Sequence, residues 1–265
     1  MSTFILKLIA CITMLADHIG WFSYMGYGNL GNVLRAFGRI SFPIFAYLIA
    51  FGFTKTRNKY LYLLRLIIVG VISELPYNYC FHNLPSRFSI ISGQNILLEL
   101  GKSLIKINNV YFTLALGLLS IILYDLIWQG NKLVKLLAPL PAVILALAAY
   151  LLGTDYGAYG VLLIFVFYLV KDSKIGITVI CTAFACRKIL ECLLKAWISS
   201  NSVVCEAGTW NMMQLFAIFA VVPILICNGS RGPQPKSKFG QKSLKYFFYL
   251  FYPVHLLILG VVFRW

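Results

Sequence analysis

The dipeptide Asp17-His18 lies within a predominantly apolar run that extends from Phe4 to Phe22. A run of this length is long enough to cross a bilayer as a helix. Ionisable side chains are costly to bury at membrane depth, and where they occur they usually mark a proton path, a substrate site or a catalytic centre. The segment therefore predicts a membrane helix with a functional polar site inside it.

The rest of the chain repeats this pattern of long apolar runs with isolated polar residues. Hydrophobic residues make up 60% of the chain and charged residues only 12%, whereas a soluble domain is typically about half apolar and a quarter charged. We therefore predict an all-α integral membrane protein, a polytopic bundle of about nine (eight to ten) transmembrane helices forming a single domain over residues 1–265. The predicted helices lie near residues 4–23, 40–54, 60–76, 110–128, 136–152, 157–171, 174–196, 210–228 and 245–263. Apolar residues at helical spacing opposite lysines also predict an interfacial amphipathic helix near residues 95–107.

The basic residues predict how the chain is oriented. A net charge of +15 would suggest a nucleic-acid partner in a soluble protein, but here Lys and Arg cluster in short loops, so we expect a lipid bilayer and no nucleic acid. The even-numbered connections are the basic ones, at residues 54–60, 128–136, 171–174 and 228–245, whereas the connections 153–156 and 197–209 carry no Lys or Arg. This predicts a multi-pass protein of the plasma membrane with a cytoplasmic N-terminus and an outer C-terminus. Arg87, Lys102 and Lys106, in a predicted outer loop, count against this orientation.

In this orientation a set of polar residues shares the central-to-outer layer of the membrane. They are Asp17, His18, Arg35, Arg39, Glu74, Asp155, Gln214 and His255. Incidental polar residues would be scattered through unrelated depths, so the convergence predicts one polar cavity reached from outside. Asp17 and His18 are neighbours on a helix and point about 100° apart, so they need separate partners. The candidate partners are His255 and one of the two arginines, Arg35 or Arg39.

Each of these residues has a structural alternative. For His18 we favour catalysis over a structural hydrogen bond, because buried polar groups in membranes are so often functional. Asp17 can orient a base or an arginine as well as react. Glu74 and Asp155 can simply be solvated at the interface. Arg35 and Arg39 can anchor to lipid headgroups, and His255 can serve helix packing.

Motifs of several enzyme classes are absent from the sequence. It contains no phosphate-binding G-x-x-x-x-G-K-[ST], no G-x-S-x-G, no H-E-x-x-H and no Rossmann fingerprint with the right context. The seven cysteines form no C-x-x-C pair and no ligand spacing with histidine, so we expect no metal. A disulfide between Cys80 and Cys205, both in predicted outer loops, stays open. Two titratable groups beside cations in a dry cavity suit general-base activation of an acceptor near neutral pH.

Several blocks of the sequence resemble the TraX family, in order and from the first predicted helix to the ninth. They are Lys7–Gly20, Leu34–Phe45, Thr56–Arg65, Asn109–Leu114, Asp155–Gly160, Gln214–Phe216 with Asn228-Gly229, and Phe248–His255. The family is named for the protein that acetylates the N-terminus of conjugative pilin, and it is similar to the wider class of membrane acyltransferases that use cytoplasmic acyl-CoA. The resemblance implies membrane-embedded acyl transfer. His18 matches the membrane histidine that serves in that class as base or transient acyl carrier.

The chain departs from the family pattern in two places. Asn78 stands where an acidic residue is expected after Glu74-Leu75-Pro76-Tyr77, and the segment before Asn109 is longer than usual. Both lie beside the predicted outer entrance, which leaves open an acceptor other than pilin.

The expected function is transfer of an acetyl group from cytoplasmic acetyl-CoA to an amine or hydroxyl at or beyond the outer side of the membrane. The acceptor is unknown and can be a peptide N-terminus, a saccharide or a small molecule; the oligomeric state also stays open. The expected catalytic residues are His18, Asp17 and Arg39, with Gln214 as the alternative to Arg39 at the oxyanion. The expected substrate-binding residues are Arg35, Glu74, Asn109, Asp155, Tyr156, Gln214 and His255.

Cytoplasmic cations are expected to meet the phosphates of acetyl-CoA, namely Arg57, Lys59, Arg65, Arg231 and Lys245. Their alternative is that they only set the topology. A proton-coupled secondary transporter or exporter would also place His, Asp and Arg at mid-membrane. The sequence shows no inverted repeat and predicts an odd number of helices, which counts against a transporter. A non-catalytic assembly factor is favoured by no sequence feature.

Overall fold

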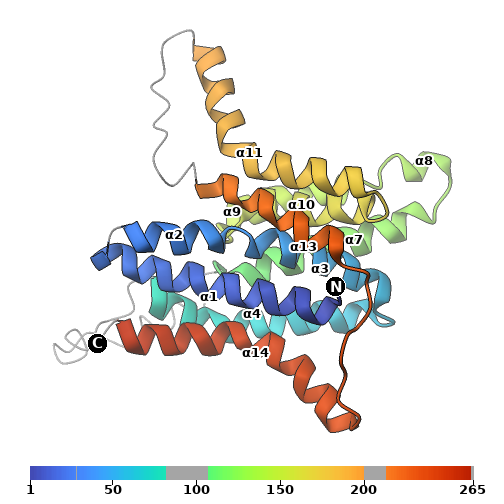
Figure 1. Ribbon diagram of the computed structural model, residues 1–265. Helices are drawn as coiled ribbons and strands as arrows, with labels where there is room; N and C mark the ends of the chain where they lie inside the picture. The colour runs from blue at the N-terminus through green and yellow to red at the C-terminus, as the bar shows by residue number, and fades with distance from the viewer. Residues whose placement is uncertain (28, 82–106, 200–212, 264–265) are drawn as a thin grey trace, which may run out of the picture. The chain divides into compact units, whose positions relative to one another are not determined.

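The described part of the chain is helical. The computed structural model describes residues 1–27, 29–81, 107–199 and 213–263, and these residues contain no β-strand. The helices are α1 (Thr3–Tyr27), α2 (Asn29–Gly38), α3 (Ser41–Lys55), α4 (Lys59–Phe81), α7 (Val110–Trp128), α8 (Lys132–Lys135), α9 (Leu140–Leu152), α10 (Gly157–Val170), α11 (Lys174–Ser199), the 3₁₀ helix η1 (Gln214–Ala220), α13 (Val221–Ile226) and α14 (Lys238–Phe263) (Figure 1). The prediction of an all-α chain is confirmed for these residues.

Six segments are long and apolar enough to cross a membrane. They are Thr3–Phe22, Asn29–Lys55, Lys59–Phe81, Val110–Trp128, Lys132–Leu152 and Lys238–Phe263, and the apolar helices Gly157–Val170 and Gln214–Ile226 are shorter. A helix also lies at each of the nine predicted places, α11 included. The chain is therefore a multi-pass membrane protein candidate, while the number of crossings and their orientation stay predictions. The predicted interfacial helix falls almost wholly outside the described residues.

The second candidate span is broken, which the sequence did not predict. A helix was expected only over residues 40–54, but α2 precedes α3 and is separated from it by a two-residue turn at Arg39-Ile40. Pro43 explains the break, because a helix running through this point would need an N–H at Pro43 and would drive its ring into the carbonyl of Arg39. In the first turn of α3 the missing N–H costs nothing. The break places Arg39 at a helix end within the span.

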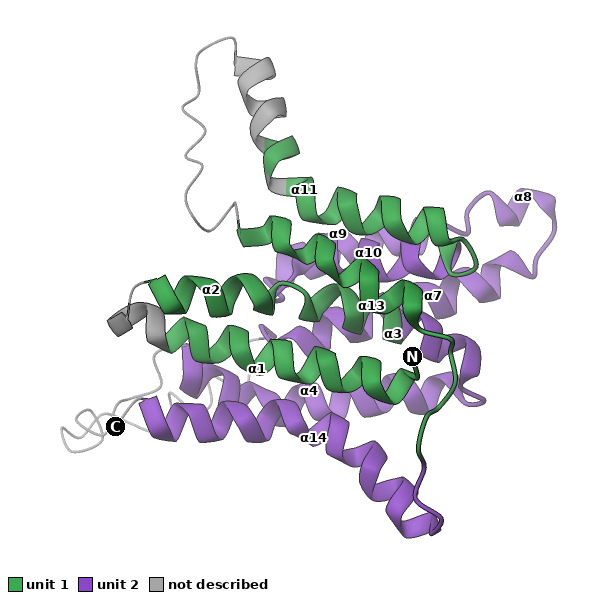
Figure 2. Ribbon diagram, viewed as in Figure 1, with its two compact units in different colours: residues 1–48, 170–233 green, residues 49–169, 234–265 purple. Residues whose placement is uncertain are grey.

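The chain divides into two compact units, each made of two segments (Figure 2). The first unit comprises residues 1–48 and 170–233, and the second comprises residues 49–169 and 234–265. In the first unit α1 packs along α2, while η1 contacts α2 and α11; in the second, α4 packs against α7 and α14, and α7 against α9. The expectation of a single domain over the whole chain stays a prediction.

Pro253 shapes α14 in the second unit. A proline in a helix cannot donate to the carbonyl four residues earlier, here that of Tyr249, so this carbonyl needs another donor. The Tyr111 hydroxyl of α7 supplies it, at 3.0 Å. Close by, the Cys80 thiol of α4 donates to the carbonyl of Leu256 at 2.9 Å. Pro253 thus leaves a carbonyl free within α14, and the bond to this carbonyl ties α14 to α7.

The disulfide between Cys80 and Cys205 stays an open question. Cys80 lies at the end of α4 with its side chain buried. Cys205 lies outside the described residues.

Candidate functional site

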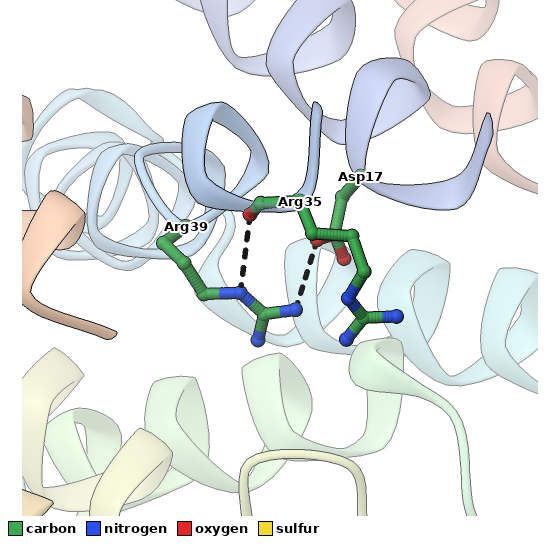
Figure 3. Close-up of polar contacts among 3 residues, drawn as sticks. All are labelled: Asp17, Arg35 and Arg39. Atoms are coloured by element: carbon green, nitrogen blue, oxygen red, sulfur yellow. Dashed lines mark hydrogen bonds and ion pairs between the residues drawn. The ribbon is translucent and has the colours of Figure 1, made fainter. Parts of the chain in front are cut away.

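In the first unit, Asp17 of α1 forms an ion pair with Arg39. Arg39 Nη2 lies 2.9 Å from Asp17 Oδ1, and each side chain is 18% exposed (Figure 3). The Arg39 backbone N–H bonds to the carbonyl of Ala36, as α2 ends. The carbonyl of Arg35 therefore loses its usual partner and accepts from Arg39 Nε instead, at 3.4 Å. Two bonds thus fix the orientation of the Arg39 guanidinium.

Glycines allow this contact by letting α1 and α2 approach closely. A Cβ added to Gly38 would overlap the Cβ of Asp17, and one added to Gly20 would lie 2.8 Å from the carbonyl oxygen of Gly31. Only a residue without a side chain fits at these two points. Arg39 thus comes within reach of Asp17 because Gly38, the residue before it, has no side chain that would keep α1 and α2 apart.

The other predicted residues of the first unit surround this pair to different degrees. Arg35 is 7% exposed, and its Cζ lies 4.6 Å from the centroid of the Trp21 ring, within cation–π range. His18 follows Asp17 on α1 and is half-buried. Gln214 is buried at the start of η1, which contacts α2. The expectation that an arginine partners Asp17 is confirmed, and Arg39 is the one.

In the second unit, the buried carboxylate of Glu74 joins α4 to the start of α7. Glu74 is 1% exposed. Its Oε1 accepts from the backbone N–H of Asn108 at 2.8 Å and of Asn109 at 3.1 Å, and from Asn109 Nδ2 at 2.9 Å. Its position at the N-terminus of a helix is also favoured by the helix dipole. Glu74 therefore has a structural role in holding α4 to the start of α7, and any contact with substrate would come in addition to it.

Asn109 is the N-cap of α7. Its side-chain oxygen accepts from the N–H of Tyr111 at 2.9 Å, and its Nδ2 also donates to the carbonyl of Gly70 at 2.8 Å. The side chain is fully buried. Asn109, which was expected to bind substrate, thus has its amide engaged within the protein.

Asn78 explains one departure from the family pattern. Its Nδ2 donates to Glu74 Oε2 and to the Glu74 carbonyl, both at 2.9 Å, one helical turn away on α4. An aspartate at this position has no N–H to donate and would set a second carboxylate against that of Glu74. The amide at residue 78 therefore completes the set of donors around Glu74.

We predict that Asn78→Asp lowers the free energy of unfolding by about 2–3 kcal/mol at neutral pH, because a donor is lost and two buried carboxylates meet. Thermal unfolding of the purified variant in detergent measures this. The loss should shrink in acid, where one carboxyl holds a proton and donates it to the other. Glu74→Gln combined with Asn78→Asp reverses the polarity of the pair and should restore stability. Equal stability of Asn78→Asp and wild type would contradict the assigned bond.

His255 lies near the proline of α14 and is 6% exposed. Its Nδ1 lies 2.7 Å from the carbonyl oxygen of Phe251. Because a carbonyl only accepts, the neutral ring carries its proton on Nδ1 and its lone pair on Nε2. The ring stacks on Phe251 at 4.9 Å and meets Tyr252 edge-on at 5.7 Å, centroid to centroid. Nε2 is therefore the nitrogen of His255 that can accept a proton.

Around Tyr252 the second unit gathers further polar groups. Tyr252 is 3% exposed, and its hydroxyl interacts electrostatically with the side chains of Asp155, Tyr77, Tyr111 and Glu74. Asp155 and Tyr156 lie in the turn before α10, Asp155 exposed and Tyr156 half-buried. The structure thus brings Glu74, Asn109, Asp155 and the neighbourhood of His255 together within this unit. The predicted cavity also includes residues of the first unit, and that convergence stays a prediction.

The cations expected to meet phosphates lie in different settings. Lys59 Nζ forms an ion pair with Asp125 at 2.8 Å and lies 4.0 Å from the centroid of the Phe53 ring. Arg65 is half-buried within α4. The remaining ones are exposed, namely Arg57, Arg231 and Lys245.

Sequence reasoning overlooked Asp125, which also accepts from the Tyr168 hydroxyl at 3.3 Å. It is the one carboxylate inside the predicted helix 110–128, so the rule applied to Asp17 would have singled it out. Among the described residues, no three His, Cys, Asp or Glu side chains are grouped so as to hold a metal ion.

Comparisons with known proteins cover nearly the whole chain. The family model described as TraX protein matches residues 2–263. A relative from Dichelobacter nodosus, named "Probable fimbrial assembly protein FimC, serogroup H1", is 28% identical over 261 residues, which cover 97% of this chain and 94% of the relative. No solved structure matches.

Proposed function

The chain belongs to the TraX family, which is associated with pilin N-acetylation, and from this we propose that it is a membrane-embedded acetyltransferase. The donor is acetyl-CoA from the cytoplasm, and the acceptor is an amine or hydroxyl at or beyond the outer side of the membrane. The observation that carries this proposal is the match over residues 2–263, which includes every expected catalytic residue.

His18 is the proposed base. It takes the proton of the acceptor N–H or O–H while the acceptor nitrogen or oxygen attacks the carbonyl carbon of the thioester. The tetrahedral oxyanion then collapses, the C–S bond breaks, and the CoA sulfur leaves and takes up the proton. In the alternative sequence of steps His18 itself carries the acetyl group before the acceptor arrives.

The Asp17–Arg39 pair supports this chemistry. The guanidinium is oriented by its bonds to Asp17 and to the Arg35 carbonyl, so it is positioned before the reaction, as oxyanion stabilisation requires. Gln214, in the same unit, is the other proposed donor to the oxyanion. Asp17 acts here by holding Arg39, which the structure supports more directly than a contact with His18.

The acceptor is proposed to be a pilin or fimbrial subunit N-terminus, because the relative from Dichelobacter nodosus is named a fimbrial assembly protein. That name also favours a second candidate, an assembly factor without catalysis. Binding of acetyl-CoA distinguishes the acetyltransferase from the assembly factor, and also from a transporter, because neither of these needs to bind a nucleotide thioester.

We expect the purified protein in lipid nanodiscs to release free CoA from acetyl-CoA when a pilin N-terminal peptide is supplied. A thiol reagent follows CoA, and mass spectrometry finds the acetyl group on the peptide. The same peptide with a blocked N-terminus is the control. Calorimetric binding of acetyl-CoA without turnover would point to another acceptor. Absence of both binding and turnover would overturn the proposed function.

A further inference from the structure

Arg65 is a cation set inside a membrane-spanning helix. It lies six residues after the first residue of α4, which corresponds to about 9 Å along the helix axis. Within the described part of the chain it forms no ion pair with a carboxylate, and its Nε is buried without a hydrogen-bond partner. A charge at such a position is costly unless something of opposite charge accompanies it.

Two tyrosines lie beside the guanidinium, and a third donates a hydrogen bond to the backbone of one of them. Arg65 Cζ lies 6.0 Å from the centroid of the Tyr62 ring on α4, and the Tyr249 hydroxyl of α14 lies near enough to Arg65 to interact electrostatically with it. Tyr111 of α7 interacts electrostatically with Tyr62 and donates to the Tyr249 carbonyl. All four residues belong to the second unit. Since phenols are neutral, the tyrosines do not cancel the positive charge of Arg65, and their O–H groups are further hydrogen-bond donors beside it.

The other described cations of this unit that were expected to meet phosphates lack these properties. Lys59 is already held by Asp125 and covered by Phe53. Arg57 and Lys245 are exposed to solvent or headgroups, where a cation is solvated and anions are screened. Arg65 therefore combines a half-buried guanidinium, neighbouring hydroxyl donors and an unneutralised charge.

We infer that Arg65, together with the hydroxyls of Tyr62 and Tyr249, forms a binding site for a phosphate group. A guanidinium matches two phosphate oxygens at once, and tyrosine hydroxyls donate to the remaining ones. Two sources carry this chemistry, the phosphates of CoA and the headgroup of an anionic lipid. Assignment to CoA rests on the proposed function, whereas assignment to lipid does not.

The test compares Arg65→Gln with wild type in calorimetric titrations with CoA. We expect CoA binding to weaken by about 10-fold to 100-fold, the usual weight of charge-assisted bonds. Turnover of acetyl-pantetheine, which has the thioester but no phosphate, should fall much less than turnover of acetyl-CoA. Tyr249→Phe keeps the ring and removes only the hydroxyl, and it should weaken CoA binding by a smaller factor. Lys132→Gln, an exposed change of the same charge, is the control.

The lipid source is tested in parallel, with the same variants reconstituted in nanodiscs of phosphatidylglycerol and neutral phosphatidylcholine. Native mass spectrometry then measures the share of phosphatidylglycerol among the lipids that stay bound to the protein. Loss of the preference for phosphatidylglycerol in Arg65→Gln, with unchanged CoA binding, would assign the site to lipid. Failure of wild type to bind CoA would count against the proposed function but leave this second measurement valid. The proposed site is wrong if folded Arg65→Gln binds both CoA and phosphatidylglycerol as well as Lys132→Gln does. It is also wrong if the wild type binds neither CoA nor phosphatidylglycerol.

Discussion

Replacing His18 by alanine is expected to lower acetyl transfer by about 10²-fold to 10⁴-fold, the usual contribution of a positioned base. The reason is that an acceptor amine or hydroxyl must lose its proton as it attacks, and in a dry membrane site water does not substitute for a base. Release of CoA measures the rate, and thermal unfolding in detergent verifies that the variant is folded. Acetyl-CoA binding should persist, because the thioester does not depend on the imidazole.

His255→Asn is the matched comparison for this experiment. Its amide N–H keeps the bond that His255 Nδ1 makes to the Phe251 carbonyl, but it removes the basic nitrogen Nε2. We expect this variant to fold and to keep its rate at saturating substrate within a few-fold, so that only substrate binding, the role expected of His255, weakens. If His255→Asn abolishes turnover while His18→Ala preserves it, the base lies on α14 and the assignment of His18 is overturned.

Glu74→Leu is expected to have the largest effect on stability, a loss of about 3–5 kcal/mol. The substitution leaves the backbone N–H groups of Asn108 and Asn109 and two side-chain amides without their acceptor in a buried place. The midpoint of thermal unfolding should fall by roughly 10 °C. Lower yield of folded protein should accompany it.

Glu74→Gln separates the charge from the hydrogen bonds. A glutamine Oε1 can still accept from the three N–H groups at the start of α7, and only the contact with Asn78 must rearrange. We therefore expect this variant to keep most of the stability of wild type. If Glu74→Leu is as stable as Glu74→Gln and only activity falls, Glu74 serves the substrate and not the joint between α4 and α7.

The helices could be predicted closely from the sequence, with one instructive failure. Runs such as 110–128 are too long and too apolar for anything but a buried or membrane helix, so their places followed from composition alone. α2 was missed because its sequence mixes Asn, Gly and Arg with apolar residues. Its helix is stabilised by packing on α1, which hydropathy does not reveal.

The chemical roles of the polar residues were predicted less well than their presence. Asp17 was correctly expected to need an arginine, yet the choice of Arg39 over Arg35 depends on where α2 ends. Glu74 was left between solvation and substrate, and the structure shows it buried at the cap of α7. Asp125 was overlooked although the same rule applied to it.

Composition and the order of residues were enough to identify this chain as a helical membrane protein candidate of the TraX family with costly polar groups inside its apolar runs. Those properties depend on composition and order along the chain. Which polar group contacts which other one depends on the packing of the helices. Asp17 and Arg39 are 22 residues apart, Glu74 and Asn109 are 35, and Lys59 and Asp125 are 66. Hydrogen bonds and ion pairs act over about 3 Å, so their partners are set by how the helices pack, and spacing along the chain does not reveal them.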